Sequence, residues 1–337
     1  MSWLYEPEPG EHDLDESDVR IRPNPKGNRP RTKIRPDHES AKRGFLFAVD
    51  KNRYQVLLDD AEVEVNATLA KELRKDGPVV GDRVLLTGDT SGIDGALARI
   101  VGIEPRESLL RRSADDSDQI ERVIVANATQ LMIVVAAANP EPRTRLIDRY
   151  LAAAYDANLR PILCITKTDL ADPEEFLRSF RGLSIPVVQT RSDSFNLDEI
   201  NRLLAGENTV LVGHSGVGKS TLVNAIAPEA NRAVGKVNDV TGRGRHTSTS
   251  VRAIRLPSGW IIDTPGIRSF GLGHIDPKNL LRSFEDLWEV IASCPRGCSH
   301  LADSPDCELD AAVASGTLGE AGAARVDSLR RLMTSLG

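Results

Sequence analysis

The sequence predicts a multidomain protein in which a small all-β barrel precedes a central α/β domain and a mainly helical C-terminal domain. Short alternating apolar runs over residues 44–105 indicate the barrel, and longer unbroken apolar runs separated by helical patterns follow from about residue 120. A length of 337 residues is enough for two or three domains. An apolar content of 40% can supply a core to each of them.

The first 43 residues have the composition of a disordered tail. Residues 6–18 hold seven carboxylates and no Lys or Arg, whereas residues 20–35 hold seven Lys or Arg residues and no carboxylate. Because large apolar side chains are scarce, this segment cannot bury enough surface to offset the entropy of ordering it. A solubilising tail and an arm that folds onto phosphate groups both remain open.

Overall charge and hydropathy point to a soluble, cytoplasmic chain that does not enter a membrane. No apolar run approaches the ~18 residues that span a bilayer, and the acidic N-terminus lacks the apolar region of a signal peptide. The net charge of −6 argues against a nucleic-acid partner if it is read globally. Basic residues nevertheless concentrate at residues 20–35, at Arg106, Arg111 and Arg112, and at residues 243–246, and one basic face is enough to meet phosphate.

Five short strands are expected within residues 44–105, over 44–49, 53–58, 61–67, 82–88 and 96–103. Five strands in about 60 residues favour an OB-fold, a barrel that often binds single-stranded nucleic acid or structured RNA. An SH3-like barrel that serves as a spacer is the alternative. The pattern of apolar residues does not separate these two barrels.

Alternating strands and helices fill residues 106–272, after a linker expected over 106–118. Strands are expected over 123–127, 130–138, 161–166, 186–190, 209–213, 250–256 and 260–264, with a helix over 144–159. Unbroken apolar strands joined by helices are typical of a mostly parallel sheet that helices cover on both faces. The helical C-terminal domain is expected over residues 273–337.

Residues 213–220 match the phosphate-binding pattern GxxxxGK[ST], between an expected strand and an expected helix. Glycines allow backbone N–H groups to approach phosphates closely, and the dipole of the following helix favours negative charge. Lys219 is expected to reach the β- and γ-phosphates, and Ser220 to offer its hydroxyl to Mg²⁺. The predicted nucleotide-binding residues here are Gly213, His214, Ser215, Gly216, Val217, Gly218, Lys219, Ser220 and Thr221.

Two further segments complete the expected phosphate end of the site. Asp263 and Gly266 form a DxxG pattern after an apolar strand, where the carboxylate can hold the metal through water and the glycine N–H can meet the γ-phosphate. Residues 242–249 lie where a switch loop belongs, so Thr247 or Thr249 is expected to complete the Mg²⁺ shell. His246 in the same loop is a candidate for orienting the attacking water.

Base recognition is predicted for Thr166, Lys167, Thr168 and Asp169, which lie at the end of the strand expected over residues 161–166. The Asp169 carboxylate can accept hydrogen bonds from N1–H and the 2-amino group of guanine, a donor pair that adenine lacks. Lys167 can lie along the base. Such motifs usually read Asn-Lys-x-Asp, and Thr166 departs from that pattern.

The order of these motifs predicts a circular permutation. A conventional GTPase domain begins with the phosphate loop and ends with the base motif, whereas Asp169 here precedes Gly213. Joining the old termini and opening new ones in a surface loop leaves the strand positions unchanged. The DxxG segment then leads directly into residues 275–337, and we expect nucleotide-dependent movement to be transmitted there.

Cys294, Cys298, His300 and Cys307 supply three thiolates and one imidazole within a short segment. This donor set predicts one closed, tetrahedral structural Zn²⁺ site. Reduced cysteines without a metal are the alternative. Cys164 lies within an apolar strand and is expected to fill the core.

The combination of a barrel, a permuted GTPase domain and a Cys-Cys-His-Cys segment resembles the RsgA (YjeQ/YloQ) family of small-ribosomal-subunit biogenesis GTPases. The matching segments are TKTD, GHSGVGKST, GRGRHTSTS, DTPGIRSFGL and CPRGCSH, and the resemblance covers residues 44 to about 310. It implies an OB-fold, bound zinc, a cytoplasmic site, late maturation of the small (30S) subunit, and hydrolysis of GTP to GDP and phosphate that the subunit stimulates.

The expected partners are therefore GTP or GDP, the small ribosomal subunit and its rRNA, with the chain acting as a monomer. Ile267 follows the DxxG segment where many GTPases carry a water-orienting glutamine, so slow intrinsic hydrolysis is expected. A metabolic ATP-dependent enzyme and a regulatory GTPase with a protein partner and no RNA are the two other classes that the motifs allow.

Overall fold

The computed structural model describes residues 40–50, 53–74, 77–113, 121–180, 183–229, 251–264, 275–282, 284–334 and 336. These residues belong to one compact unit, which begins at Ser40. The expected tail therefore lies largely outside the described residues. None of the helices in the described part of the chain has the length and hydropathy that a bilayer crossing requires.

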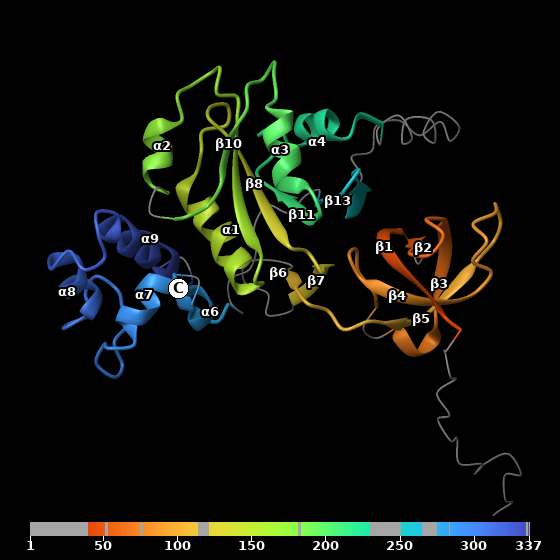
Figure 1. Ribbon diagram of the computed structural model, residues 1–337, viewed down its shortest axis with the longest axis horizontal. Coiled ribbons are helices and arrows are strands. Elements are labelled where there is room, and N and C mark those ends of the chain that lie inside the picture. Colours follow the sequence, from red (N-terminus) through yellow and green to blue (C-terminus); the bar gives the residue numbers. More distant parts are fainter. Residues whose placement is uncertain are drawn as a thin grey trace, which may run out of the picture. The chain divides into compact units, whose positions relative to one another are not determined.

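Five strands close into a barrel, coloured orange in Figure 1. They pair in the order β1-β2-β3-β5-β4, and β4 pairs back to β1. The β3–β5 pair is parallel and the others are antiparallel. This closed five-stranded barrel confirms the predicted OB-fold. Its strands are β1 (Lys42–Asp50), β2 (Arg53–Leu58), β3 (Glu64–Leu69), β4 (Arg83–Gly88) and β5 (Ala98–Ile103), with a 3₁₀ turn η2 (Lys71–Leu73) after β3.

Alternation in the barrel strands explains why these sequences form strands around a core. Along β2, every second side chain is buried: Tyr54, Val56 and Leu58. These pack with buried aliphatic residues of the other strands, such as Leu46 and Ile100. A period of two puts one face of each strand inside the barrel and the other in solvent.

Residues 109–113 of the predicted linker form a strand of a two-stranded sheet. Strand β6 (Leu109–Ser113) pairs antiparallel with β7 (Glu121–Ala126). The strand expected at 123–127 therefore exists, but it lies outside the main sheet. The sequence of this segment predicts a linker because basic residues interrupt its apolar pattern. Residues 109–113 form a strand only because β7, further along the chain, pairs with them.

Arg106, which belongs to the expected linker, forms a paired fork with Asp82 beside the barrel. Its Nε and Nη2 atoms donate to the two Asp82 carboxylate oxygens, each at 2.7 Å. Asp82 is fully buried and also accepts the Val79 N–H at 2.7 Å. The guanidinium thus neutralises a buried carboxylate, which corrects the view of Arg106 as part of a phosphate-binding patch.

The central sheet has the strand order β10-β9-β8-β11-β13-β12. All neighbours in it are parallel except β12, which runs antiparallel to β13 and pairs on its other side with β1 of the barrel. The mostly parallel sheet is therefore confirmed. Its strands are β8 (Gln130–Ala136), β9 (Arg160–Thr166), β10 (Val187–Gln189), β11 (Glu207–Val212), β12 (Arg252–Arg255) and β13 (Gly259–Asp263).

Helices cover both faces of this sheet (Figure 1). Alternate residues of β8 point to opposite faces, so Ile133 packs in the same cluster as α1 and Met132 in the cluster of α3 and α4. Burial on both faces requires the unbroken apolar strands seen in the sequence. The helices are α1 (Thr144–Asp156), α2 (Glu174–Arg178), α3 (Leu197–Leu204) and α4 (Lys219–Ile226).

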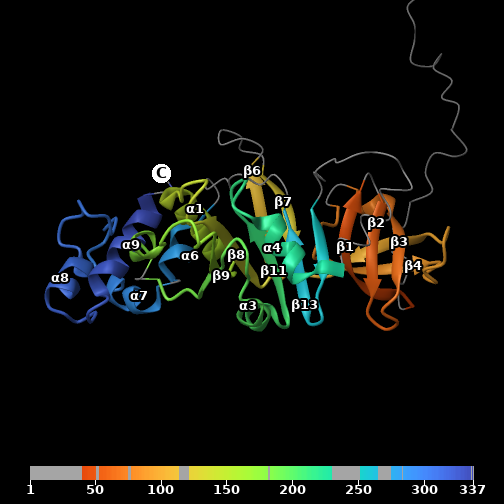
Figure 2. The same cartoon turned by 90° about the horizontal axis from the view of Figure 1, so that it is seen from above.

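The C-terminal region is helical, as predicted, and Figure 2 shows its helices in blue, gathered together. They are α6 (Pro277–Arg282), α7 (Glu285–Ile291), α8 (Glu308–Ala314) and α9 (Gly322–Thr334). Arg331 of α9 donates to Asp148 of α1 and to the Ser179 carbonyl, each at 2.8 Å. The Asp148 side chain is only 1% exposed, so this is a buried ion pair that joins α9 to α1.

Replacing Arg331 with methionine is expected to lower the free energy of unfolding by about 3 kcal/mol, because Asp148 then stays buried without its cation. Burial already raises the pKa of Asp148, and Arg331 opposes that rise. The double variant Asp148→Asn, Arg331→Met should recover much of the loss. Urea unfolding measures each value, with Arg178→Met as an exposed control. An Arg331→Met chain as stable as the parent would contradict this role.

Candidate functional site

The phosphate-binding loop spans the gap between β11 and α4. Gly213 follows the last residue of β11, and Gly218 is the N-cap of α4 with φ of 97°. The Lys219 Nζ atom donates to the Gly213 carbonyl at 3.0 Å. The Lys219 side chain thus folds back across the loop, where it would meet the oxygen atoms of a bound phosphate. The sequence forms this loop because its glycines accept backbone angles that other residues avoid.

Gly213 has a close neighbour that explains why glycine stands there. A Cβ atom on Gly213 would lie 2.3 Å from the carbonyl oxygen of Val134 in β8, and the φ angle is 152°. Backbone cannot move away from such a contact without disturbing the sheet. The close approach therefore ties the first turn of the loop to the neighbouring strand.

The base motif lies at the same edge of the sheet as the phosphate loop. Strands β8, β9, β11 and β13 are parallel, so their carboxyl ends meet there. Thr166 ends β9, and Lys167, Thr168 and Asp169 form the turn that follows. Two segments separated by about 45 residues in the chain are thereby brought together.

Thr166 and Lys167 bond directly to the phosphate loop. The Thr166 hydroxyl, which is buried, donates to the Val217 carbonyl at 2.5 Å and lies 3.3 Å from the Val135 carbonyl. The Lys167 ammonium donates to the Gly216 carbonyl at 2.8 Å and to the carbonyl of Asn139. Threonine thus bonds the phosphate loop directly, although it departs from the usual asparagine.

Replacing Thr166 with valine should weaken GDP binding about tenfold, because the Val217 carbonyl loses its donor at a buried position. Thr166→Ser keeps the hydroxyl and should bind GDP nearly as well as the parent. Calorimetric titration with GDP measures both. Equal affinities for the valine and serine variants would show that the bond has no role in positioning the loop.

Asp169 is exposed and its carboxylate is already oriented. One oxygen accepts the Ser192 N–H at 2.6 Å, and this bond holds the pKa of Asp169 below its ordinary value. The Thr168 hydroxyl donates to the Thr190 carbonyl at 3.2 Å. The loop after β10 thus orients the base motif through backbone groups. The sequence does not reveal this role of Thr190 and Ser192, because a backbone contact leaves no mark on side-chain type.

The phosphate end of the site holds one cation and one anion. Burial lowers the pKa of Lys219, and the Asp263 carboxylate opposes that shift. Burial likewise raises the pKa of Asp263, and Lys219 opposes it. The next residue, Thr264, is fully buried and donates to the Leu211 carbonyl at 2.8 Å, which fixes the end of β13 against β11.

Four of the predicted site residues lie outside the described part of the chain. They are His246, Thr247, Thr249 and Gly266. Ile267, where a glutamine is common, lies outside it as well. Ser220 and Thr221 are described, and both are exposed in the first turn of α4.

The second site is the Cys-Cys-His-Cys cluster between α7 and α8. The ligand atoms of Cys294, Cys298, His300 and Cys307 all lie within 4.8 Å of one another. Sulfur atoms around a tetrahedral metal at 2.3 Å are about 3.8 Å apart. The Nδ1 atom of His300 is buried and has no hydrogen-bond partner, as expected for an imidazole nitrogen that binds a metal ion. The residues present therefore fit a bound metal ion.

Local backbone geometry brings these four ligands together. Gly297 adopts φ of 83° in the turn between the first two cysteines, and His300 adopts φ of 59°. The Cys298 N–H bonds the Pro295 carbonyl at 3.1 Å, which closes that turn. Cys307 is the N-cap of α8, so a helix end holds the fourth ligand.

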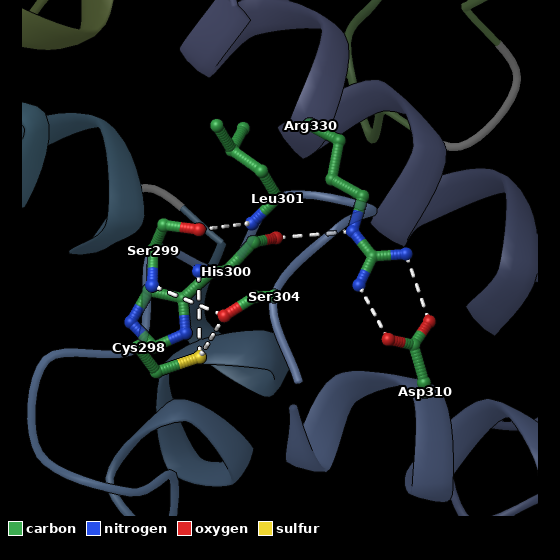
Figure 3. A network of polar contacts seen from close by, with 7 residues as sticks. All are labelled: Cys298, Ser299, His300, Leu301, Ser304, Asp310 and Arg330. Atoms are coloured by element: carbon green, nitrogen blue, oxygen red, sulfur yellow. Dashed lines mark hydrogen bonds and ion pairs between the residues drawn. The ribbon is translucent and has the colours of Figure 1, made fainter. Parts of the chain in front are cut away.

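Arg330 of α9 braces the metal-binding loop, a role that the sequence did not reveal. It donates through Nε to the His300 carbonyl at 3.0 Å and grips Asp310 of α8 with two bonds of 2.8 Å (Figure 3). A bidentate Arg–carboxylate pair has a fixed geometry. Helices α8 and α9 thus fix the loop that carries the cluster, through Asp310 and Arg330.

A phosphate loop bonded to a guanine-type base motif at the carboxyl edge of a parallel sheet defines a P-loop nucleotide-binding enzyme. The model of one family, described as RsgA GTPase, matches residues 103–273. The chain is 35% identical over 294 residues to the small ribosomal subunit biogenesis GTPase RsgA of Pseudomonas fluorescens, which covers 84% of this chain and 82% of that protein. The chain belongs to the RsgA GTPase family, and it is a GTP-hydrolysing enzyme.

Other comparisons agree with this assignment. The protein of the same name from Shewanella oneidensis is 36% identical over 269 residues, or 77% of this chain and 74% of that protein. The solved structure of YjeQ from Thermotoga maritima is similar with a TM-score of 0.66 and 26% identity, covering 88% of this chain and 98% of that one. YloQ, described as a circularly permuted GTPase, gives a TM-score of 0.65 and 27% identity, covering 89% and 96%.

Proposed function

We propose that this GTPase binds the small (30S) ribosomal subunit and assists its late maturation, and that the subunit stimulates hydrolysis of GTP to GDP and phosphate. The names of its relatives link them to biogenesis of that subunit. The observation that carries the nucleotide part is the pair of bonds from Thr166 and Lys167 to the phosphate loop. These bonds join the segment proposed to recognise the base to the loop proposed to bind the phosphates.

Within this proposal, Asp169 selects guanine, with Lys167 beside the base and Thr166 setting the position of the phosphate loop. The loop residues from Gly213 to Thr221 bind the phosphates, and Asp263 and Gly266 respond to the γ-phosphate. Mg²⁺, when bound, neutralises charge that develops on the phosphates. Ser220 would hold it, together with Thr247 or Thr249.

Catalysis depends on a group that orients water, and Ile267 cannot supply it because its side chain is aliphatic. We assign that role to His246 or to a group that the subunit supplies. Alanine at position 246 should then reduce subunit-stimulated turnover while GDP affinity stays unchanged. Full stimulated turnover in that variant would exclude His246.

The metal in the Cys-Cys-His-Cys cluster is proposed to be one structural Zn²⁺ per chain. Three thiolates and one imidazole form a closed set with no position left for a reacting ligand. The small helical region around the cluster then gains folding free energy from the metal. The proposed domains are the tail over residues 1–43, the OB-fold over 44–105, the GTPase domain over 106–272 and the zinc-binding domain over 273–337.

The chain is proposed to act as a cytoplasmic monomer that contacts the rRNA of the subunit. The OB-fold supports an RNA partner, because such barrels present strands and loops to oligonucleotides. An affinity for the subunit that falls as salt rises is the expected sign of phosphate contacts.

Co-sedimentation with purified small subunits tests the proposed function. Binding should be stronger with a non-hydrolysable GTP analogue than with GDP, and subunits should raise the rate of phosphate release. Excess GTP but not ATP should displace labelled GDP, because Asp169 recognises guanine. A folded chain that hydrolyses GTP at the same rate with and without subunits, and that stays in the supernatant, would contradict the proposal.

A further inference from the structure

The connection between β4 and β5 presents apolar side chains to solvent. Ile93 is 71% exposed and Leu97 is 52% exposed, and they lie four residues apart in one loop over residues 89–97. Among the described residues, five large hydrophobic residues are exposed by 37% or more, and the two in this loop are among the three that reach 52%. Exposed apolar residues that occur together mark interaction sites more often than single ones do.

This loop is ordered by its own hydrogen bonds and by the neighbouring turn. The Ser91 N–H bonds an Asp89 oxygen at 3.0 Å, and the Ala96 N–H bonds the Ile93 carbonyl at 2.9 Å. Gly92 lies so close to the turn between β2 and β3 that a Cβ would be 2.9 Å from the Glu64 carbonyl. The apolar side chains therefore extend from a braced support, which lowers the entropy that a partner must overcome.

The same edge of the barrel is acidic. Residues 59–64 and 89–97 together contain six carboxylates and no Lys or Arg. Three of the carboxylates are paired, because Asp59 bonds Arg83, Asp60 meets Lys42 at 3.9 Å and Glu62 meets Arg255 at 2.7 Å.

The other three carboxylates, Glu64, Asp89 and Asp94, are exposed and form no ion pair with any described residue. Two of these unpaired negative charges lie in the loop that carries the two apolar side chains, and Glu64 lies beside Gly92 of that loop. We call Glu64, Asp89, Ile93, Asp94 and Leu97 the acidic edge of the barrel.

The charge of this edge decides which kind of molecule it fits. Nucleic-acid phosphates would be repelled by three unpaired carboxylates, and apolar side chains offer phosphates nothing. A protein surface with Lys or Arg around an apolar patch is complementary in both respects. The OB-fold can therefore meet RNA elsewhere while this edge faces protein.

We propose that the acidic edge docks onto a basic, partly apolar surface of a protein component of the small subunit. This inference rests on the proposed function and adds a protein contact to the RNA contact. The edge adds selectivity, because phosphate contacts alone carry no sequence information and so do not distinguish one stretch of RNA from another.

Charge reversal separates a protein partner from an RNA partner. The double variant Asp89→Lys, Asp94→Lys should bind small subunits about five- to tenfold more weakly, because two attractive contacts become repulsive. The matched control Glu289→Lys, Glu320→Lys makes the same change of net charge at two exposed positions of the helical region, and should bind as tightly as the parent or slightly more tightly. Affinity is measured by titrating labelled full-length chain with purified subunits at constant salt.

A second variant tests the apolar part. Ile93→Ser, Leu97→Ser should weaken subunit binding roughly tenfold, while GDP affinity and the thermal unfolding temperature stay at the parent values. A benzophenone side chain placed at position 93 should, after irradiation of the complex, yield a crosslink that protease removes and ribonuclease leaves.

The outcomes are distinct. Tighter binding by the lysine variant than by its control, or a crosslink to RNA, would mean that the edge faces nucleic acid and would overturn the inference. Unchanged binding by both the lysine and serine variants would overturn it too. If the parent chain itself does not bind subunits, both the proposed function and this inference are wrong. If the parent binds and the variants bind equally well, only this inference is wrong.

Discussion

Asparagine at position 169 is expected to lower the affinity for GTP by roughly 10²–10³-fold, because a site built around specific hydrogen bonds rejects a base that it cannot pair. In the proposed function, the Asp169 carboxylate accepts hydrogen bonds from the N1–H and the 2-amino group of guanine. An amide presents an NH₂ group at one of those positions, so a donor faces a donor. Xanthine carries a carbonyl in place of the 2-amino group, and the variant should therefore prefer XTP.

Calorimetry with GDP and XDP, together with turnover of GTP and XTP, measures this change of specificity. Asp172→Asn is a matched control, since Asp172 lies three residues further on and caps the Glu174 N–H at 3.0 Å. That variant should bind GDP as the parent does. An Asp169→Asn chain that still prefers GDP over XDP would remove Asp169 from base recognition and with it the main reason for guanine specificity.

Serine at position 307 is expected to release the metal and to unfold the helices that surround it. Apparent metal-binding free energies are about 10–16 kcal/mol in zinc-finger peptides, so loss of one ligand should lower the stability of this region by at least roughly 4 kcal/mol. Cys307 is 4% exposed at the start of α8. Its loss also removes the metal from the loop around His300, which Arg330 contacts from outside.

Elemental analysis measures the metal, and hydrogen exchange measures the unfolding. Exchange should rise over residues 284–334 and stay at the parent level over the barrel, residues 40–103. Cys164→Ala is the control, because Cys164 is buried in β9 and far from the cluster in sequence. It should keep the full metal content at a cost of about 1 kcal/mol. A Cys307→Ser chain with one metal per chain and unchanged exchange would exclude this cysteine as a ligand.

Nucleotide state provides a further test of how the site communicates with the rest of the chain. The sequence order places the DxxG segment directly before the C-terminal helices, and Arg331 joins α9 to α1 of the GTPase domain. Hydrogen exchange over residues 275–334 should therefore differ between GDP and a non-hydrolysable GTP analogue. Identical exchange in both states would mean that this connection carries no signal.

The sequence alone determined the parts of this protein that depend on local pattern. Alternation with period two placed the five barrel strands, and unbroken apolar runs placed the parallel strands, because burial on one face or on both leaves a periodic mark. The phosphate loop, the base motif and the cysteine spacing were also visible, since each needs particular residue types at short, fixed separations. Even the permutation could be inferred, because it is a matter of order along the chain.

Only the tertiary structure decided what depends on partners far apart in sequence. Residues 109–113 form a strand because β7 pairs with them, and Arg106 serves Asp82 instead of phosphate. The Thr166 hydroxyl bonds the Val217 carbonyl of the phosphate loop, which lies 51 positions further along the chain. Each of these outcomes depends on which residue lies nearby in the folded chain. A hydrogen bond or an ion pair between residues distant in sequence leaves no periodic signal in that sequence.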